Sequence, residues 1–244
     1  MIMNTQQLSD KLALWIREKV SAAGLKGVVF GVSGGLDSSV VAALCSRAFD
    51  KNILGLIMPC HSCQQDEQHA LAVAGKFSIP TKTIILDDVC DTLLERLSFD
   101  ENQVISQAVK GNLKARLRML TLYFFANQLQ YLVVGSGNRS ELATGYFTKH
   151  GDGSVDILPL GNLVKRQVKE LAEFLKIPQE IIDKPPSAGL WAGQTDEDEL
   201  GFSYDELDDY LTGGKASQEN RLKIEKMITG SGHKRNPPPV SDFR

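Results

Sequence analysis

The sequence predicts an α/β fold in which helices flank a doubly wound parallel sheet, in a Rossmann-like arrangement. Short apolar runs alternate with helical patterns through the first half of the chain, and this alternation is typical of βαβ units. The runs are continuously apolar, as strands buried on both faces of a parallel sheet are. We expect residues 1–244 to form a single domain with an N-terminal helix and a C-terminal tail.

Each element follows from its own pattern. Strands are predicted where the chain is continuously apolar, at residues 27–33, 52–59, 81–86 and 131–137, with a further short strand at 155–158. Helices are predicted where apolar residues recur every three or four positions, at residues 8–20, 38–48, 64–77, 89–97, 103–128, 164–175 and 217–228. Ser203 and Glu206 have the spacing of a capping box, which begins one more helix. The tail after residue 230 cannot be helical around its three prolines.

The composition argues against several classes of protein. The net charge of −3 provides no positive surface for nucleic acid. No apolar run approaches the roughly 20 residues that span a bilayer. Four cysteines in 244 residues are too few for a disulfide scaffold, so we expect a reducing, cytoplasmic environment.

The segment GVSGGLDSSVV, residues 31–41, lies where the first predicted strand passes into a helix. Gly34 and Gly35 allow the backbone to approach a ligand, and the helix N-terminus offers unpaired N–H groups that suit phosphate. Asp37 would repel phosphates unless a magnesium ion bridges them. The segment lacks the GKS or GKT ending of a Walker A loop. It predicts a magnesium–nucleotide site, and a tight turn capped by serines without a ligand is the alternative.

This segment resembles the pyrophosphate loop of the ATP pyrophosphatase family, whose fold is called adenine nucleotide alpha-hydrolase-like. Members cleave ATP between the α and β phosphates and adenylate a substrate oxygen. Four further segments resemble the NAD synthetases among them: GNLKARLRM, GSGNRSELATGYFTKHGDGSVDILPLGNLVKRQV, QTDEDELGFSYDELDDYL and GHKRNPP. The resemblance covers nearly the whole chain. It implies a ligase that uses Mg-ATP, deamido-NAD and ammonia.

The resemblance also implies roles for individual residues. ATP binding is assigned to Gly31, Val32, Ser33, Gly34, Gly35, Leu36, Asp37, Ser38, Ser136, Lys165 and Thr195. Magnesium binding is assigned to Asp37 and Glu141. Binding of deamido-NAD is assigned to Arg116, Lys149, Asp156, His233 and Lys234. The expected catalytic residues are Asp37, Glu141, Lys165 and Asp152. Asp152 is expected to hold ammonium and to accept its proton.

Each assignment has a structural alternative. Arg116 belongs to a basic helix face that contact with solvent explains, and Glu141 stands where a carboxylate stabilises a helix N-terminus. Asp152 lies in a GDG tripeptide, which is normally a turn. Lys165 is compatible with an exposed helix start, and the acidic run at 196–199, which follows Thr195, with a solvated loop. The His-Lys pair of the tail is compatible with a disordered end.

The segment CHSC at residues 60–63 raises the question of zinc. Cys60, His61 and Cys63 are possible ligands, with His69 further along the chain. The sequence has one CxxC and no second pair of ligands at zinc-finger spacing. A loop that lines the nucleotide site is therefore the favoured interpretation.

The nitrogen source and the assembly are further expectations. Glutamine-using synthetases carry an additional amidohydrolase domain, and the synthetase pattern begins too early here to leave room for one. We therefore expect free ammonia, or ammonia from a separate protein. The resemblance implies a homodimer with the dinucleotide near the interface. The loops at 148–155 and 187–194 are expected to be mobile without ligands and to close over the adenylate.

Two other functions remain open. Adenylation of a different acceptor, as in GMP synthetases or tRNA-modifying relatives, is the nearest alternative. The acidic balance disfavours tRNA, and the lack of a recognisable dimerisation domain disfavours GMP synthetase. A nucleotide-binding sensor or an electron-transfer module is the alternative from another class. Magnesium-dependent release of pyrophosphate separates an enzyme from such a module.

Overall fold

A four-stranded parallel sheet forms the centre of the computed structural model, which describes residues 3–98, 104–191 and 193–243. The strands are β1 (Gly27–Gly31), β2 (Ile53–Ile57), β3 (Thr81–Thr83) and β4 (Tyr131–Val133). Their spatial order is β3-β2-β1-β4, so β1 pairs with β2 on one side and with β4 on the other. The strand order therefore reverses at β1, and a crevice opens at the carboxyl ends of β1 and β4.

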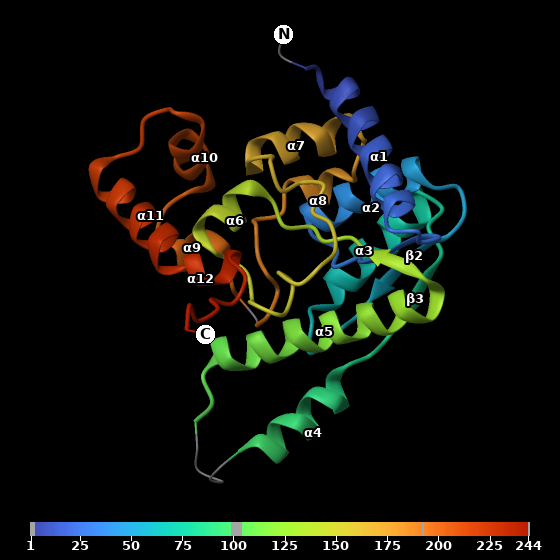
Figure 1. Ribbon diagram of the computed structural model, residues 1–244, viewed down its shortest axis with the longest axis horizontal. Helices are drawn as coiled ribbons and strands as arrows, with labels where there is room; N and C mark the ends of the chain where they lie inside the picture. Colours follow the sequence, from blue (N-terminus) through green and yellow to red (C-terminus); the bar gives the residue numbers. More distant parts are fainter. Residues whose placement is uncertain (1–2, 99–103, 192, 244) are drawn as a thin grey trace.

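Helices cover both faces of the sheet, as the doubly wound prediction requires (Figure 1). One face packs against α1 (Thr5–Ala22), α2 (Leu36–Ala48), α3 (Gln64–Lys76) and α7 (Lys165–Phe174). The other face packs against α4 (Asp87–Leu97) and α5 (Gln107–Leu129). Successive residues of β1 alternate between these cores: Val28 and Phe30 enter the first, and Val29 enters the second. All are fully buried, which explains the continuously apolar strand.

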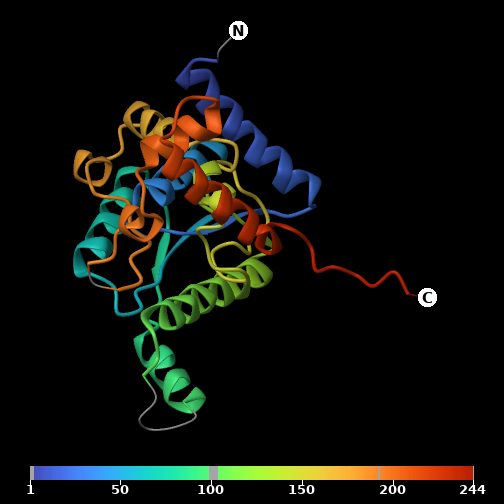
Figure 2. The same cartoon turned by 90° about the vertical axis from the view of Figure 1, so that its left-hand side faces the viewer.

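The second half of the chain adds smaller helices beside the crevice. They are α6 (Arg139–Thr144), α8 (Gln179–Ile182), α9 (Asp196–Leu200), α10 (Tyr204–Thr212), α11 (Gln218–Gly230) and α12 (Gly232–Arg235). Leu207 of α10 and Ile224 of α11 are the fully buried residues of a third apolar cluster. After α12 the chain extends away from the body (Figure 2). None of the helices in the described part of the chain combines the length and hydropathy that a bilayer crossing needs.

The structure corrects several boundaries. The predicted strand at 81–86 is a regular strand only over Thr81–Thr83, although Ile84 and Leu86 still donate to the segment at the end of β2. The predicted strand at 155–158 is reduced to one bridge between Val134 and Ile157. The tail is helical over Gly232–Arg235, because its prolines begin only after this turn. The predicted start of the fifth helix, Gln103, lies outside the described residues. The division into one domain stays a prediction.

Asp208 is expected to be one of the most sensitive positions for stability. Its carboxylate is buried and accepts hydrogen bonds from the backbone N–H groups of Lys165 and Arg166, at 3.3 and 2.7 Å, and from the Ser140 hydroxyl at 2.6 Å. Replacing Asp208 by alanine leaves the Arg166 N–H and the Ser140 hydroxyl without this acceptor, and the Lys165 N–H keeps only the Ser140 oxygen at 3.2 Å. We therefore expect a loss of about 2–4 kcal/mol in the free energy of unfolding. Urea denaturation measures it. Asp209→Ala, at an exposed neighbour, should cost less than about 1 kcal/mol; equal losses would contradict the capping role.

Candidate active site

The loop after β1 leaves the N-terminus of α2 open toward the crevice. Gly35 is the N-cap, and no side chain caps the helix. The Ser38 hydroxyl instead donates to the Gly35 carbonyl, at 3.0 Å, and lies 2.9 Å from the Ser33 hydroxyl. Because the first N–H groups of a helix lack intrahelical partners, this end presents donors and a partial positive charge. The arrangement suits the phosphate groups of a nucleotide.

Gly34 gives this loop its shape. Its φ of +77° lies in the left-handed region, which only glycine adopts at little cost. A Cβ atom at this position would lie 2.2 Å from the backbone oxygen of Asp66. The loop is therefore pressed against the start of α3, and the glycine is required both for the turn and for the contact.

A lysine and two carboxylates from three different elements meet beside the loop. Lys165 Nζ, at the first position of α7, lies 2.5 Å from Asp37 Oδ2 and 3.5 Å from Glu141 Oε1. Asn138 donates to the other oxygen of Asp37 at 2.9 Å. Glu141 also completes a capping box with Asn138 at the start of α6, so the structural alternative is confirmed for this residue, and its assignment to magnesium stays a prediction. The side chain of Lys165 is only 10% exposed, which corrects the alternative of an exposed lysine.

Burial and charge shift the protonation of this cluster. Burial, and next the neighbouring Asp37, raise the pKa of Glu141 to about 8, although Lys165 opposes the shift. The pKa of Lys165 is raised, because the attraction of Asp37 and Glu141 outweighs its desolvation. The two carboxylates offer hard oxygen donors from facing elements, and a bound cation would displace the proton that Glu141 retains. This donor set fits a divalent cation that prefers oxygen ligands and retains water and phosphate ligands.

A second layer holds Lys165 in place. The Tyr204 ring lies 5.0 Å from Lys165 Nζ, and the Tyr204 hydroxyl donates to Asp196 Oδ2 at 2.9 Å. Asp196 is 4% exposed, and burial raises its pKa. The structural alternative for the acidic run, a solvated loop, is wrong: the run forms α9 (Asp196–Leu200), in which Asp196 is buried and the next three acidic residues are exposed. Asp196 is the first residue of α9, which Thr195 caps with its hydroxyl, and its carboxylate is turned inward toward the Tyr204 hydroxyl.

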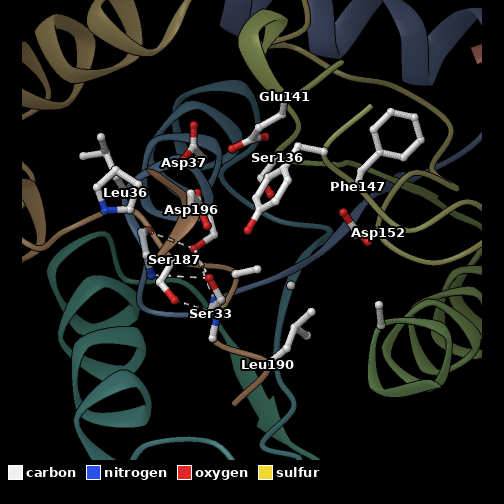
Figure 3. A pocket seen from close by; sticks show the side chains of 18 of the residues that line it. Ser33, Leu36, Asp37, Ser136, Glu141, Phe147, Asp152, Ser187, Leu190 and Asp196 are labelled. Carbon is white, nitrogen blue, oxygen red and sulfur yellow. Dashed lines mark hydrogen bonds between the residues drawn. The ribbon is translucent and has the colours of Figure 1, made fainter. Parts of the chain in front are cut away.

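These groups line a cavity of about 760 Å³, a volume typical of ligand sites. Figure 3 shows Asp37, Glu141 and Asp196 gathered in one part of it, with Asp152 and Leu190 in others. Predicted residues that line the cavity are Gly31, Val32, Ser33, Gly35, Leu36, Asp37, Ser38, Ser136, Glu141, Asp152, Lys165 and Lys234. The structure thus brings together most of the predicted ATP and metal residues from distant parts of the sequence.

Asp152 and Lys234 lie on the same wall of the cavity. The Asp152 carboxylate accepts a hydrogen bond from the Thr148 N–H at 2.9 Å. Its side chain is exposed and lines the cavity, and desolvation by the surrounding protein raises its pKa. Lys234 Nζ donates to the carbonyl oxygens of Gly145 and Phe147, at 2.7 and 2.8 Å, so the tail is tied to the wall rather than disordered.

Several predicted residues do not line the cavity. Arg116 is exposed on the outer side of α5 and donates to the Lys149 carbonyl at 3.1 Å. Asp156 accepts from the Val133 N–H at 2.8 Å and from the Tyr123 hydroxyl at 3.0 Å, beside a second, shallower depression. The remaining residues of this group are Gly34, Lys149, Thr195 and His233. Their assigned roles in binding stay predictions.

Comparison with known proteins identifies the family. The NAD synthase family model matches residues 8–238. The chain belongs to the NAD synthase family. It is 46% identical to the NH(3)-dependent NAD(+) synthetase of Syntrophomonas wolfei over 98% of this chain and 97% of that protein.

Solved structures agree with the family assignment. An NMN synthetase from Francisella tularensis is 39% identical, with a TM-score of 0.94 and coverage of 99% of this chain and 100% of that one. An NH3-dependent NAD synthetase from Campylobacter jejuni is 29% identical, with a TM-score of 0.81, over 98% and 100% of the two chains. The predicted doubly wound fold is thereby confirmed as the NAD synthase fold.

Some residues of this NAD synthase site were not predicted from the sequence. Asn138 carried a readable signal, because an asparagine three positions before Glu141 is a capping box. No local sequence signal, apart from the resemblance of their segment to the family, pointed to Asp196, Tyr204 and Asp208. They act through contacts between α7, α9 and α10 that the order of residues along the chain does not display.

The pKa of Glu141 gives the NAD synthase chain a testable pH dependence. The pKa of Glu141 is raised from 4.5 to about 8, so between these pH values the folded state retains a proton that the unfolded chain has released. The free energy of unfolding therefore decreases as the pH rises from about 4.5 to about 8. Glu141→Gln removes the titration. Without nucleotide and metal, the stability of the variant relative to the parent should therefore increase from about pH 5 to about pH 9. Thermal midpoints at both pH values measure it. Glu18→Gln, at an exposed residue of α1, should show no such trend, and a constant difference for Glu141→Gln would contradict the assignment.

Proposed function

We propose that this protein is an ammonia-dependent NAD synthetase, which adenylates the nicotinate carboxylate of deamido-NAD with ATP and converts it to the amide. The observation that carries the proposal is the Asp37–Lys165–Glu141 cluster beside the uncapped N-terminus of α2 in one cavity. The first turn of α2 provides both the N–H groups that suit phosphate and the carboxylate of Asp37 that suits a cation. Such a pairing suits the release of pyrophosphate. The family and its named relatives supply the acceptor.

In this mechanism the chain binds and orients its substrates, because ATP itself activates the carboxylate. The loop at Ser33–Ser38 and the α2 N–H groups hold the phosphates. A carboxylate oxygen of the nicotinate attacks the α-phosphorus, and pyrophosphate leaves. Lys165 stabilises the negative charge that develops on the departing phosphates. Asp37 and Glu141 are the residues that would hold Mg²⁺, which neutralises phosphate charge when bound.

Amide formation requires ammonia as the free base. Ammonium carries a proton at neutral pH and cannot attack a carbonyl carbon. Asp152 lines the cavity, and its carboxylate can attract ammonium and accept the proton. Nitrogen then attacks the acyl carbon of the adenylate, and AMP leaves. Most of the rate is expected to come from positioning and electrostatics rather than from a protein nucleophile.

A second acceptor deserves a direct test. The structure of the Francisella tularensis NMN synthetase is more similar to this chain than that of the Campylobacter jejuni NAD synthetase, with TM-scores of 0.94 and 0.81. Moreover, four residues assigned to the dinucleotide lie outside the cavity: Arg116, Lys149, Asp156 and His233. Nicotinate mononucleotide, which lacks the second nucleotide, is therefore the alternative acceptor for the same chemistry.

The decisive experiment offers both acceptors. The purified protein receives ATP, Mg²⁺ and ammonium with deamido-NAD or nicotinate mononucleotide, and pyrophosphate and the amide product are followed together. A higher kcat/KM for deamido-NAD, with one pyrophosphate per amide, supports the proposal. A higher kcat/KM for the mononucleotide assigns the alternative. Absence of pyrophosphate with both acceptors in folded protein would refute the adenylation chemistry.

We further propose that the protein acts as a homodimer through the outer face of α5. Leu120 and Phe124 are 64% and 63% exposed there, and Arg116 lies on the same face, one turn before Leu120 and two turns before Phe124. A second copy seated on this apolar stripe would bring Arg116 to the interface, where the resemblance expects the dinucleotide. Leu120→Asp combined with Phe124→Asp should convert a dimer into a monomer in sedimentation. A dimer that persists in this variant would reject this face.

The compartment follows from the cysteines. Cys45, Cys60 and Cys90 are buried free thiols, and Cys63 is an exposed one. Free thiols persist in a reducing environment. We therefore place the enzyme in the cytoplasm, where ATP is also available.

A further inference from the structure

Helix α5 presents one stripe of residues to the cavity. The α5 residues that line it are Ala108, Asn112, Ala115, Arg118, Met119 and Leu122. Their spacing of three and four places them on one side of the helix. Arg118 alone among them is charged, and it faces away from the exposed side that carries Arg116. The side of α5 that forms a wall of the cavity therefore bears one guanidinium group, that of Arg118.

The guanidinium uses little of its hydrogen-bonding capacity on the protein. Its Nε donates to the Met58 carbonyl at 3.1 Å, and its Nη2 donates to the Ser62 hydroxyl at 3.1 Å. A guanidinium has five N–H groups, so most of them have no partner among the residues that the structure describes. Within the ranges 3–98, 104–191 and 193–243, Arg118 forms no ion pair within 4.0 Å.

The charge of Arg118 is poorly compensated for a group withdrawn from bulk water. Burial lowers its pKa, and the carboxylates that oppose this shift, Asp152 and Asp66, are not in contact with it. Asp66 is already paired with Lys184. Lys114, one helical turn earlier, is buried, and its one hydrogen-bond acceptor within the described part of the chain is the Leu190 carbonyl, at 2.8 Å. A partly buried cation without a counter-ion is costly, and an anionic ligand would remove this cost.

We propose that Arg118 binds an oxyanion of a substrate in the cavity, either a phosphate group of the adenine nucleotide or the phosphate or carboxylate of the nicotinate nucleotide. The inference rests on the proposed function and deepens it by assigning a binding residue that the sequence had not singled out. The free edge of a guanidinium matches two oxygens of such a group at once. The contacts with Met58 and Ser62 fix the side chain beforehand, which reduces the entropy lost on binding.

A binding experiment without turnover separates the possible ligands. Trp191 lines the cavity, and the one other tryptophan of the sequence is Trp15. In a Trp15→Phe background, fluorescence titrations with AMP, with Mg-ATP and with nicotinate mononucleotide report each ligand singly. Arg118→Met removes the charge and keeps the apolar stem, whereas Arg118→Lys keeps the charge. Arg221→Met, at an exposed residue of α11, is the matched control, and thermal midpoints verify folding.

The expected result is selective. Arg118→Met should weaken either the adenine nucleotides or the mononucleotide by about 10- to 100-fold, Arg118→Lys should weaken the same ligand less, and Arg221→Met should bind as the parent does. The ligand that is weakened identifies the source of the oxyanion. Two outcomes would overturn the proposal: unchanged affinity in Arg118→Met, or equal losses of affinity in both Arg118 variants. In either case the role of Arg118 would be structural, through its hydrogen bonds between α5 and the segment after β2. If the parent itself binds none of these ligands, the proposed function fails instead.

Discussion

Replacing Asp37 by asparagine is expected to reduce pyrophosphate release by about 10³-fold, because one substitution removes a charged metal ligand and the closest counter-ion of Lys165. Asp37 lies in the first turn of α2, 2.5 Å from Lys165 Nζ, and Asn138 fixes its second oxygen. Asparagine has nearly the same shape and retains an oxygen, so the loop should keep its conformation. The loss should therefore appear in kcat and in the dependence on Mg²⁺, with little change in the thermal midpoint.

A matched control separates this effect from a general loss of charge. Asp10→Asn removes an exposed carboxylate that pairs with Arg47 in the last turn of α2. Its rate should stay within about twofold of the parent, since exposed ion pairs contribute little. Direct binding of Mn²⁺ with ATP, followed by electron paramagnetic resonance, gives a readout that does not depend on turnover. Normal turnover in Asp37→Asn would reject the assignment of this carboxylate as a metal ligand.

Replacing Gly34 by alanine is expected to have the largest structural effect at the site. Alanine at a φ of +77° is strained, and its Cβ would meet the Asp66 backbone oxygen at 2.2 Å. Because backbone cannot yield as a flexible side chain does, either the loop or the start of α3 must move. We expect a loss of about 2–4 kcal/mol in the free energy of unfolding, together with weakened binding of ATP.

Gly24 provides the control for this substitution. Its φ is +67°, but a Cβ there would have no heavy atom within 4 Å. Gly24→Ala therefore has the strain of the left-handed conformation without the clash and should cost about 1–2 kcal/mol, with ATP binding unchanged. Urea denaturation and nucleotide titration of both variants measure the difference. If Gly34→Ala costs no more than Gly24→Ala, the close approach to α3 is not a constraint on this loop.

Local sequence was sufficient for the elements that carry the site. The continuously apolar β1, the glycine turn and Asp37 follow one another along the chain, so the conformation and the phosphate chemistry of the loop could be predicted together. Ser203 before Glu206 was likewise predicted as a helix start, and its hydroxyl accepts from the Glu206 N–H. Such signals are read within a few residues, because turns and caps are made by neighbours in sequence.

The tertiary structure alone decided which side chains meet. The sequence determined an α/β sheet, a phosphate loop and the family that the segments resemble, and it pointed to Arg116 on α5. Packing turned Arg118 toward the cavity and Arg116 toward solvent, and it buried Asp196 in a run that reads as a solvated loop. The reason is physical: burial depends on which elements pack against a side chain, and contacts between distant elements such as α2 and α7 leave no trace in the local order of residues.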